Sequence, residues 1–166
     1  PTMKLRFRRF SASTLMAIGM VLASVAAASS SKAEDFRISS FTVDVTIPLN
    51  HRCMGVLPTK SQKILDPLYT HGFVLQSTDL TFVFCAVDWC EIRNDSYDAW
   101  RKALAHSTGT TADRVMVCSL HQHDAPVIDE GAERLLSSVN LAGELFDAKF
   151  LDETLLRVAK AAADCM

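Results

Sequence analysis

The sequence lacks several features that would assign it to a specialised class of protein. Its 166 residues contain no internal repeat and, after residue 33, no low-complexity tract, which argues against a repeat architecture. Five of the 17 Lys and Arg residues, and none of the 19 Asp and Glu residues, lie in residues 1–33, so the remainder carries a formal charge of −7. A surface without a basic excess repels phosphate backbones, so we expect no nucleic-acid partner.

Cysteine is sparse and odd in number. The five cysteines show no spacing typical of a disulfide framework, so their pairing stays open, although an oxidising compartment would permit bridges. Cys85 and Cys118 lie in apolar strand-like runs, where we expect small buried hydrophobic residues rather than bridges.

Charge is absent from residues 10–31, which follow a basic cluster near Met3. The uncharged stretch is rich in Ala and Ser, and it is short of the roughly 20 strongly apolar residues that cross a bilayer. It ends in Ser-Lys-Ala at 31–33, the small-x-small form that signal peptidases cleave. We therefore interpret residues 1–33 as a signal peptide cleaved after Ala33, with a secreted or periplasmic product and no stable membrane span. The alternative is a retained membrane anchor. The pair Arg8-Arg9 is compatible with a twin-arginine signal, so the export route, Sec or twin-arginine, stays open.

Residues 34–166 suffice for one modest core and predict an α/β domain. Strand patterns occur at 37–47, 72–76, 80–87 and 114–120, and helical patterns at 95–106 and 150–163. The runs 72–76 and 80–87 read as a hairpin. The order strand–helix–strand across 80–120 predicts a right-handed βαβ unit in a mixed sheet with flanking helices. The strand at 114–120, apolar almost throughout, is expected to be central and covered on both faces.

The helix at 95–106 has clear boundary signals. We expect Asn94 or Asp95 to cap its beginning and Gly109 to end it. The apolar stripe expected to pack on the sheet consists of Tyr97, Trp100 and Leu104.

The strand at 115–120 runs directly into His121-Gln122-His123-Asp124. Ligands of open α/β sheets collect at the carboxyl ends of strands. In extended backbone, residues i and i+2 point the same way, so His121 and His123 can face one centre. Imidazole suits zinc, and a neighbouring carboxylate extends the donor set. The alternative is that both histidines are surface polar residues that bind nothing.

Five short motifs follow one another between Phe41 and Pro126. They are VDVTIPL (43–49), MG (54–55), DPLY (66–69), FVFCAVD (82–88), and DRVMV followed by HQHDAP (113–117 and 121–126). In this order they resemble the opening D-I-T-P-P strand, the Met-Gly turn, the D-P-L-Y segment, the strand ending in S-x-D, and the D-R-V-x-x … H-T-H-S-G-P run of the neutral (alkaline, non-lysosomal) ceramidase family, N-terminal domain.

The resemblance implies a zinc-dependent amidase acting on a small-molecule or lipid N-acyl substrate. The first His of the family motif is a zinc ligand, which corresponds to His121, and the second lies beside the site, which corresponds to His123. Asp124-Ala125 replaces the family's Ser-Gly and adds a carboxylate, so Asp124 joins His123 as a candidate catalytic residue. The family's remaining ligands, a second His, a Glu and a Tyr, lie much further along. We therefore expect an N-terminal fragment that is inactive alone.

Two other residues are candidates for lining the pocket. His51 lies in the loop that replaces the family's Gly-rich segment, and Asp88 ends the strand at 80–87. A structural hydrogen-bonding role is the alternative for Asp88. For the whole chain the alternative is a non-catalytic exported binding domain that keeps the fold and has lost the metal.

Overall fold

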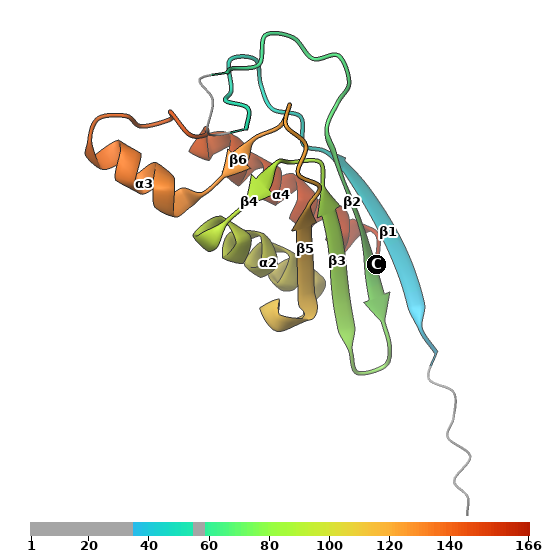
Figure 1. Ribbon diagram of the computed structural model, residues 1–166. Helices are drawn as coiled ribbons and strands as arrows, with labels where there is room; N and C mark the ends of the chain where they lie inside the picture. Colours follow the sequence, from blue (N-terminus) through green and yellow to red (C-terminus); the bar gives the residue numbers. More distant parts are fainter. Residues whose placement is uncertain (1–34, 55–58) are drawn as a thin grey trace, which may run out of the picture. The chain divides into compact units, whose positions relative to one another are not determined.

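Runs of alternating apolar residues build a mixed four-stranded sheet, seen face-on in Figure 1. This computed structural model describes residues 35–54 and 59–166, so the predicted signal peptide lies outside the described residues. The strand order is β1-β2-β3-β5. The strands are β1 (Arg37–Asp44), β2 (Tyr69–Gln76), β3 (Thr81–Val87) and β5 (Val115–Ser119). β1, β2 and β3 are antiparallel neighbours, and β5 is parallel to β3. The predicted mixed α/β fold and the hairpin are confirmed.

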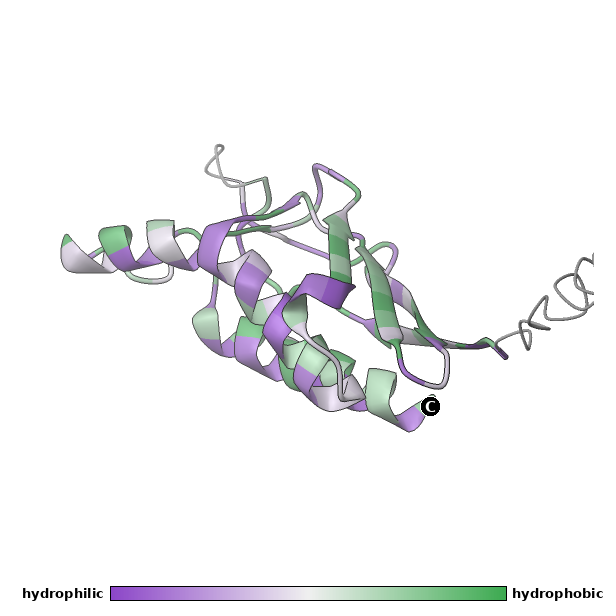
Figure 2. Cartoon of the chain, turned by 90° about the horizontal axis from the view of Figure 1, so that it is seen from below, coloured by the Kyte–Doolittle hydropathy of each residue, from purple (hydrophilic) through white to green (hydrophobic). Residues whose placement is uncertain are grey.

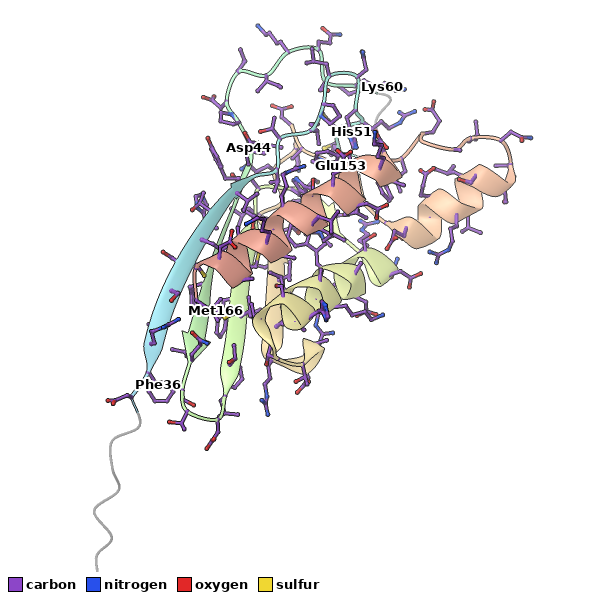
Figure 3. All side chains as sticks on the ribbon, turned by 180° about the vertical axis from the view of Figure 1, so that it is seen from behind. Phe36, Asp44, His51, Lys60, Glu153 and Met166 are labelled. Carbon is purple, nitrogen blue, oxygen red and sulfur yellow. The ribbon has the colours of Figure 1, made fainter. Side chains whose placement is uncertain are left out.

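Helices α2 (Asn94–Thr108) and α4 (Ala148–Asp164) lie on one face of the sheet, as Figure 3 shows from behind. α2 packs on β3 and β5, whereas α4 packs on β1 and β2, and the two helices contact each other. Trp100 and Leu104 of the predicted stripe are fully buried, and Tyr97 is half-buried against the same core. Trp100 meets the buried Trp89 edge-on, with ring centroids 5.3 Å apart. The core therefore lies between this face and the helix pair.

The two ends of α2 bear out the sequence signals differently. Gly109 ends the helix in the left-handed conformation (φ 67°), as predicted. The prediction of a side-chain cap by Asn94 or Asp95 is wrong, because Arg93 occupies the N-cap position and no side chain caps the helix there. Asn94 instead donates from its amide nitrogen to Asp129 Oδ2 at 2.7 Å. The Asn94 side chain therefore makes a tertiary hydrogen bond to Asp129 instead of capping its own helix.

The strand β5 is an edge strand of the four-stranded sheet, not the central strand that its apolar sequence predicted. Val115 and Val117 are buried beneath α2, whereas Met116 and Cys118 on the other face are exposed. The expectation of a buried Cys118 is therefore also wrong, whereas Cys85 is buried as expected. All five cysteines, which lie in the described part of the chain, are free thiols.

Four elements were not predicted from the sequence, one of which is the 3-10 helix η1 (Ala112–Arg114) between α2 and β5. Helix α3 (Glu130–Ser138) buries only Glu133. The strands β4 (Glu91–Ile92) and β6 (Val127–Ile128) pair in parallel as a separate ribbon. Each has two residues, which is too short to show a period.

The carboxyl ends of β1, β3 and β5 meet at one edge of the sheet, at the top of Figure 1, because these three strands share one direction. The segments that follow them, 45–54, 88–93 and 120–128, gather beyond this edge, and the hydrogen bonds from Cys90 N to Pro126 O and from Met54 N to Ala125 O join them. Within residues 35–54 and 59–166, we find no helix with the length and apolarity needed to span a bilayer.

Candidate functional site

A cavity of about 300 Å³ opens at this edge of the sheet, where the segments after β3 and β5 meet. We call it the His121 cavity. Its lining residues are Met54, Cys90, Glu91, Arg93, His121, His123, Val127, Asp129, Ala132 and Leu145. The β4–β6 ribbon forms part of its wall, because Glu91 pairs with Val127 in that ribbon. Two imidazoles, two carboxylates, a guanidinium and a thiol are thus set among apolar side chains.

The backbone of His121 is fixed by the end of the parallel ladder. Leu120 N donates to Val87 O at 3.0 Å and His121 N donates to Trp89 O at 3.1 Å, which continues the pairing of β5 with β3 past the strand ends. His121 has a φ of 60°, in the left-handed region that a residue with a side chain seldom adopts. Such a conformation persists only where the surroundings over-determine it, and functional sites are enriched in it.

One ring nitrogen of His121 is engaged by the neighbouring segment. Its Nδ1 lies 3.2 Å from Cys90 O, and 3.8 Å from both Cys90 Sγ and Glu91 Oε1. A carbonyl oxygen can only accept, so in this hydrogen bond Nδ1 carries the proton and Nε2 keeps its lone pair. The side chain of His121 lines the cavity and is 62% exposed, so much of the ring is accessible to solvent.

The structure brings His121 and His123 together, with ring centroids 5.2 Å apart and the rings nearly perpendicular. Gln122 and Asp124 instead line a second cavity of about 510 Å³ beneath the loop that includes residues 59–68. Asp124 contributes there to a raised pKa of the Cys53 thiol, after the larger effect of burial. His121 and His123 therefore share one side of the segment, and Asp124 lies on the other.

Asp88 and His51 make hydrogen bonds within the fold. Asp88 Oδ2 accepts from Tyr69 N at 2.8 Å, which ties the end of β3 to the start of β2, and Asp88 does not line the His121 cavity. His51 is 5% exposed and lies beside the N-terminal end of α4, where Figure 3 labels it. Its Nδ1 donates to Arg52 O at 2.8 Å and its Nε2 accepts from Asp147 N at 3.2 Å. It lines a separate cavity of about 130 Å³.

Four polar residues of the cavity were not among the predicted site residues, namely Cys90, Glu91, Arg93 and Asp129. Glu91 forms an ion pair with Arg93 and stands beside His121. Cys90 is buried, and burial first and Glu91 second raise the pKa of its thiol, so it stays protonated and is a poor nucleophile at neutral pH. Cys90, Glu91 and Arg93 lie shortly after β3, at the carboxyl edge of the sheet, and this position was a signal that could have identified them.

The donor set fits a metal ion only in part. Within the described ranges, no three His, Cys, Asp or Glu side chains are arranged to hold a metal ion. The His121–His123 pair supplies two imidazoles, whereas catalytic zinc generally takes three protein ligands and a water. A search against protein-family models gave no match for this chain, and neither did a search of curated proteins.

Proposed function

We propose that the chain is an exported zinc-dependent hydrolase of an N-acyl amide bond, similar to neutral ceramidase, and that His121 is a zinc ligand. The observation that carries this proposal is the hydrogen bond of His121 Nδ1 to Cys90 O, 3.2 Å long. Metal-binding histidines usually donate their second ring N–H to a carbonyl or carboxylate, which fixes the ring and directs the other nitrogen to the metal. His121 has this arrangement beside an open cavity, with the Glu91 carboxylate 3.8 Å from the same nitrogen.

Zinc bound at His121 would supply a water with a pKa lowered to about 7 and would polarise the acyl carbonyl. In this proposal further ligands would complete the site, since the described residues offer no set of three. In this proposal the chain is the N-terminal part of a larger domain and does not hydrolyse substrate alone. Its sheet would then contain the right-handed β3–α2–β5 crossover that such units nearly always adopt.

His123 is the residue of this chain suited to moving a proton in the cavity. Its ring lies against that of His121 and lines the same cavity, so it can protonate a departing amine. Asp124 was the second candidate, but it lines the other cavity, which gives it no support as a proton donor near His121. The apolar wall formed by Met54, Val127 and Leu145 suits an acyl group.

Zinc titration calorimetry on the longest product of the gene tests the proposal. We expect about one zinc per chain, and a loss of that binding in His121→Ala with the fold retained. His71→Ala is the matched control, because His71 is exposed on β2 away from the cavity. The chain ending at Met166 should bind zinc weakly or not at all. Equal affinity in the wild type and His121→Ala would remove His121 from the site and the main support for an enzyme.

Export is part of the same proposal. Cleavage after Ala33 would release a chain that begins with Glu34-Asp35 and coincides with the compact unit Glu34–Met166. N-terminal sequencing of the secreted product checks this, and a product that still starts at Met3 would contradict it.

One observation favours a second candidate, a non-catalytic exported binding domain. The described residues contain an intact core and a formed cavity, yet no complete set of metal ligands. The calorimetry separates the two candidates, because a binding domain without metal would show no zinc binding in the longest gene product.

A further inference from the structure

Helix α3 carries an apolar stripe that faces away from the core. Its apolar residues recur at the spacing of one helical face, namely Ala132, Leu135, Leu136 and the C-cap residue Val139. Such a stripe ordinarily packs on the body of the protein, yet the residue that α3 buries is Glu133. Leu135 is 72% exposed and Val139 is 61% exposed. We call the four apolar residues the α3 stripe.

Polar contacts hold α3 at its beginning and along one flank. Glu130 N donates to Ser96 Oγ at 2.9 Å, which ties the first turn to α2. Glu133 accepts from Gly143 N and Leu145 N, which fixes the segment after the helix against that flank. The last turns of α3 therefore stand clear of the sheet, as Figure 1 shows, and Figure 2 shows hydrophobic residues on them.

The α3 stripe continues the wall of the His121 cavity. Ala132, the first residue of the stripe, lines that cavity together with Met54, Val127 and Leu145. Leu145 lies in the segment that returns from α3, and Leu141 in the same segment is 48% exposed. An apolar surface thus leads from the cavity, over the first turn of α3, to the outer end of the helix.

Charge is absent from the outer part of this surface. Residues 135–143 contain no Asp, Glu, Lys or Arg, and their polar side chains belong to Ser137, Ser138 and Asn140. Uncharged polar groups beside Leu and Val suit the boundary between the headgroups and the acyl chains of a bilayer, where amphipathic helices insert by about 5–10 Å. The chain after residue 33 carries a formal charge of −7, so an anionic lipid surface repels it. This combination favours a zwitterionic lipid surface.

The size of the stripe distinguishes a lipid surface from a protein partner. α3 has nine residues and is therefore about 14 Å long, so a stripe about 10 Å wide covers roughly 140 Å². A stable protein interface takes about 800 Å² from each partner, which is several times more. Insertion into a bilayer needs no such area, because each large apolar side chain that leaves water contributes on its own.

We propose that the α3 stripe inserts into a zwitterionic lipid surface and docks the molecule there, with the His121 cavity beside that surface. With nine residues, α3 lies on the bilayer and does not cross it. Docking goes beyond the function proposed above and needs neither zinc nor hydrolysis. Either proposal can therefore fail without the other.

Flotation with phosphatidylcholine vesicles, in a buffer that contains a chelator, tests the docking. The chain from Glu34 to Met166 is used, because it forms a compact unit of its own and lacks the uncharged stretch 10–31, which would itself bind lipid. We expect the wild type to bind and Leu135→Ser to lower the partition coefficient roughly tenfold. Leu156→Ser is the matched control, because Leu156 is also 72% exposed and lies on α4. It should bind as the wild type does.

A tryptophan introduced into the α3 stripe reports where the protein touches the vesicle. The native Trp89 and Trp100 are fully buried, so they contribute a constant background. The emission of Leu135→Trp should shift to shorter wavelength when phosphatidylcholine vesicles are added, whereas that of Leu156→Trp should not. Equal responses of the two variants would contradict docking through α3.

Three results of the flotation would overturn the proposal. The first is a wild type that does not float with phosphatidylcholine vesicles, which would leave a protein segment as the cover of the stripe. The second is an equal loss of binding in Leu135→Ser and Leu156→Ser. The third is binding that requires anionic phosphatidylglycerol and is abolished by salt, because another surface would then attach by charge.

Discussion

Two histidines at the same end of the sheet differ in how their ring nitrogens are used. His51 lies in the segment that follows β1, and His121 lies in the segment that follows β5. Both segments lie beyond the carboxyl edge of the sheet. His51 is buried, with Nδ1 donating to Arg52 O and Nε2 accepting from Asp147 N. His121 is exposed, and only its Nδ1 has a backbone partner, the carbonyl of Cys90.

The difference separates a histidine that holds the fold from one that can bind a ligand. Because both of its ring nitrogens are hydrogen-bonded, His51 has no lone pair or proton left for a ligand. Its ring packs edge-on against Phe150, with the ring centroids 5.4 Å apart. With Nε2 free, His121 can coordinate a metal or exchange a proton without breaking a hydrogen bond of the fold. The number of ring nitrogens that are hydrogen-bonded within the fold therefore says more about a histidine's capacity to bind a ligand than its position in the chain does.

The largest expected effect is on stability at His51. His51→Ala leaves Asp147 N and Arg52 O without their side-chain partner and leaves a cavity beside Phe150. We expect the free energy of unfolding to fall by about 2–4 kcal/mol. Urea unfolding followed by circular dichroism measures it. A loss below about 0.5 kcal/mol, as for an ordinary surface substitution, would mean that His51 does not anchor α4.

Much of the fold could be predicted because its signals are local. The hairpin of β2 and β3 and the end of α2 at Gly109 follow from alternation and from a left-handed glycine. Helix α3 was missed although it has a local start signal, because the Asp129 side chain caps it by accepting from Ala132 N. The residue that it buries is Glu133, which accepts hydrogen bonds from Gly143 N and Leu145 N, whereas Leu135 is 72% exposed.

The place of β5 in the sheet could not be predicted, because strand order is not a local property. A strand that is apolar on both faces fits a central position, but here Met116 and Cys118 project from the solvent-exposed side of an edge strand. The apolar composition of a strand thus does not reveal its position in the sheet or which part of the protein covers its faces.

His121 and His123 lie together, as the sequence pattern predicted, with their ring centroids 5.2 Å apart. The extended backbone on which that prediction was based is not present there, because β5 ends at Ser119 and His121 has a φ of 60°. Asp124 lines the other cavity. The approach of Glu91 to His121 depends on the pairing of β4 with β6, which no local pattern reveals.

The second largest expected effect is the contribution of His51 to the pH dependence of the free energy of unfolding. Burial, the dominant cause, lowers its pKa from the usual 6.5, and Lys60 adds to this, whereas the Arg52 carbonyl and Asp147 act in the opposite direction. Above pH 6.5 His51 is neutral in both states, and its full contribution to stability is present. As pH falls below 6.5, the unfolded chain takes up a proton that the folded chain does not, so stability is lost until the lower folded pKa is reached.

Comparison of the wild type with His51→Gln isolates this contribution. Below pH 6.5 the wild type should lose up to about 1.4 kcal/mol per pH unit more than the variant. Urea unfolding at closely spaced pH values gives the two slopes, and the carboxylates contribute equally to both proteins. Parallel curves would show that the pKa of His51 is the same in the folded and unfolded chains.

The smallest expected effect is on stability at His121, and this sharpens the contrast between the two histidines. His121→Ala removes an exposed ring and one hydrogen bond to Cys90 O, while Leu120 N and His121 N keep their backbone partners. We expect the free energy of unfolding to fall by about 1 kcal/mol or less, because the left-handed backbone is retained and the one hydrogen bond lost is that to the Cys90 carbonyl. Urea unfolding without metal measures it. A loss as large as that of His51→Ala would mean that His121 also serves the fold, and its free Nε2 would then lose its value as a sign of ligand binding.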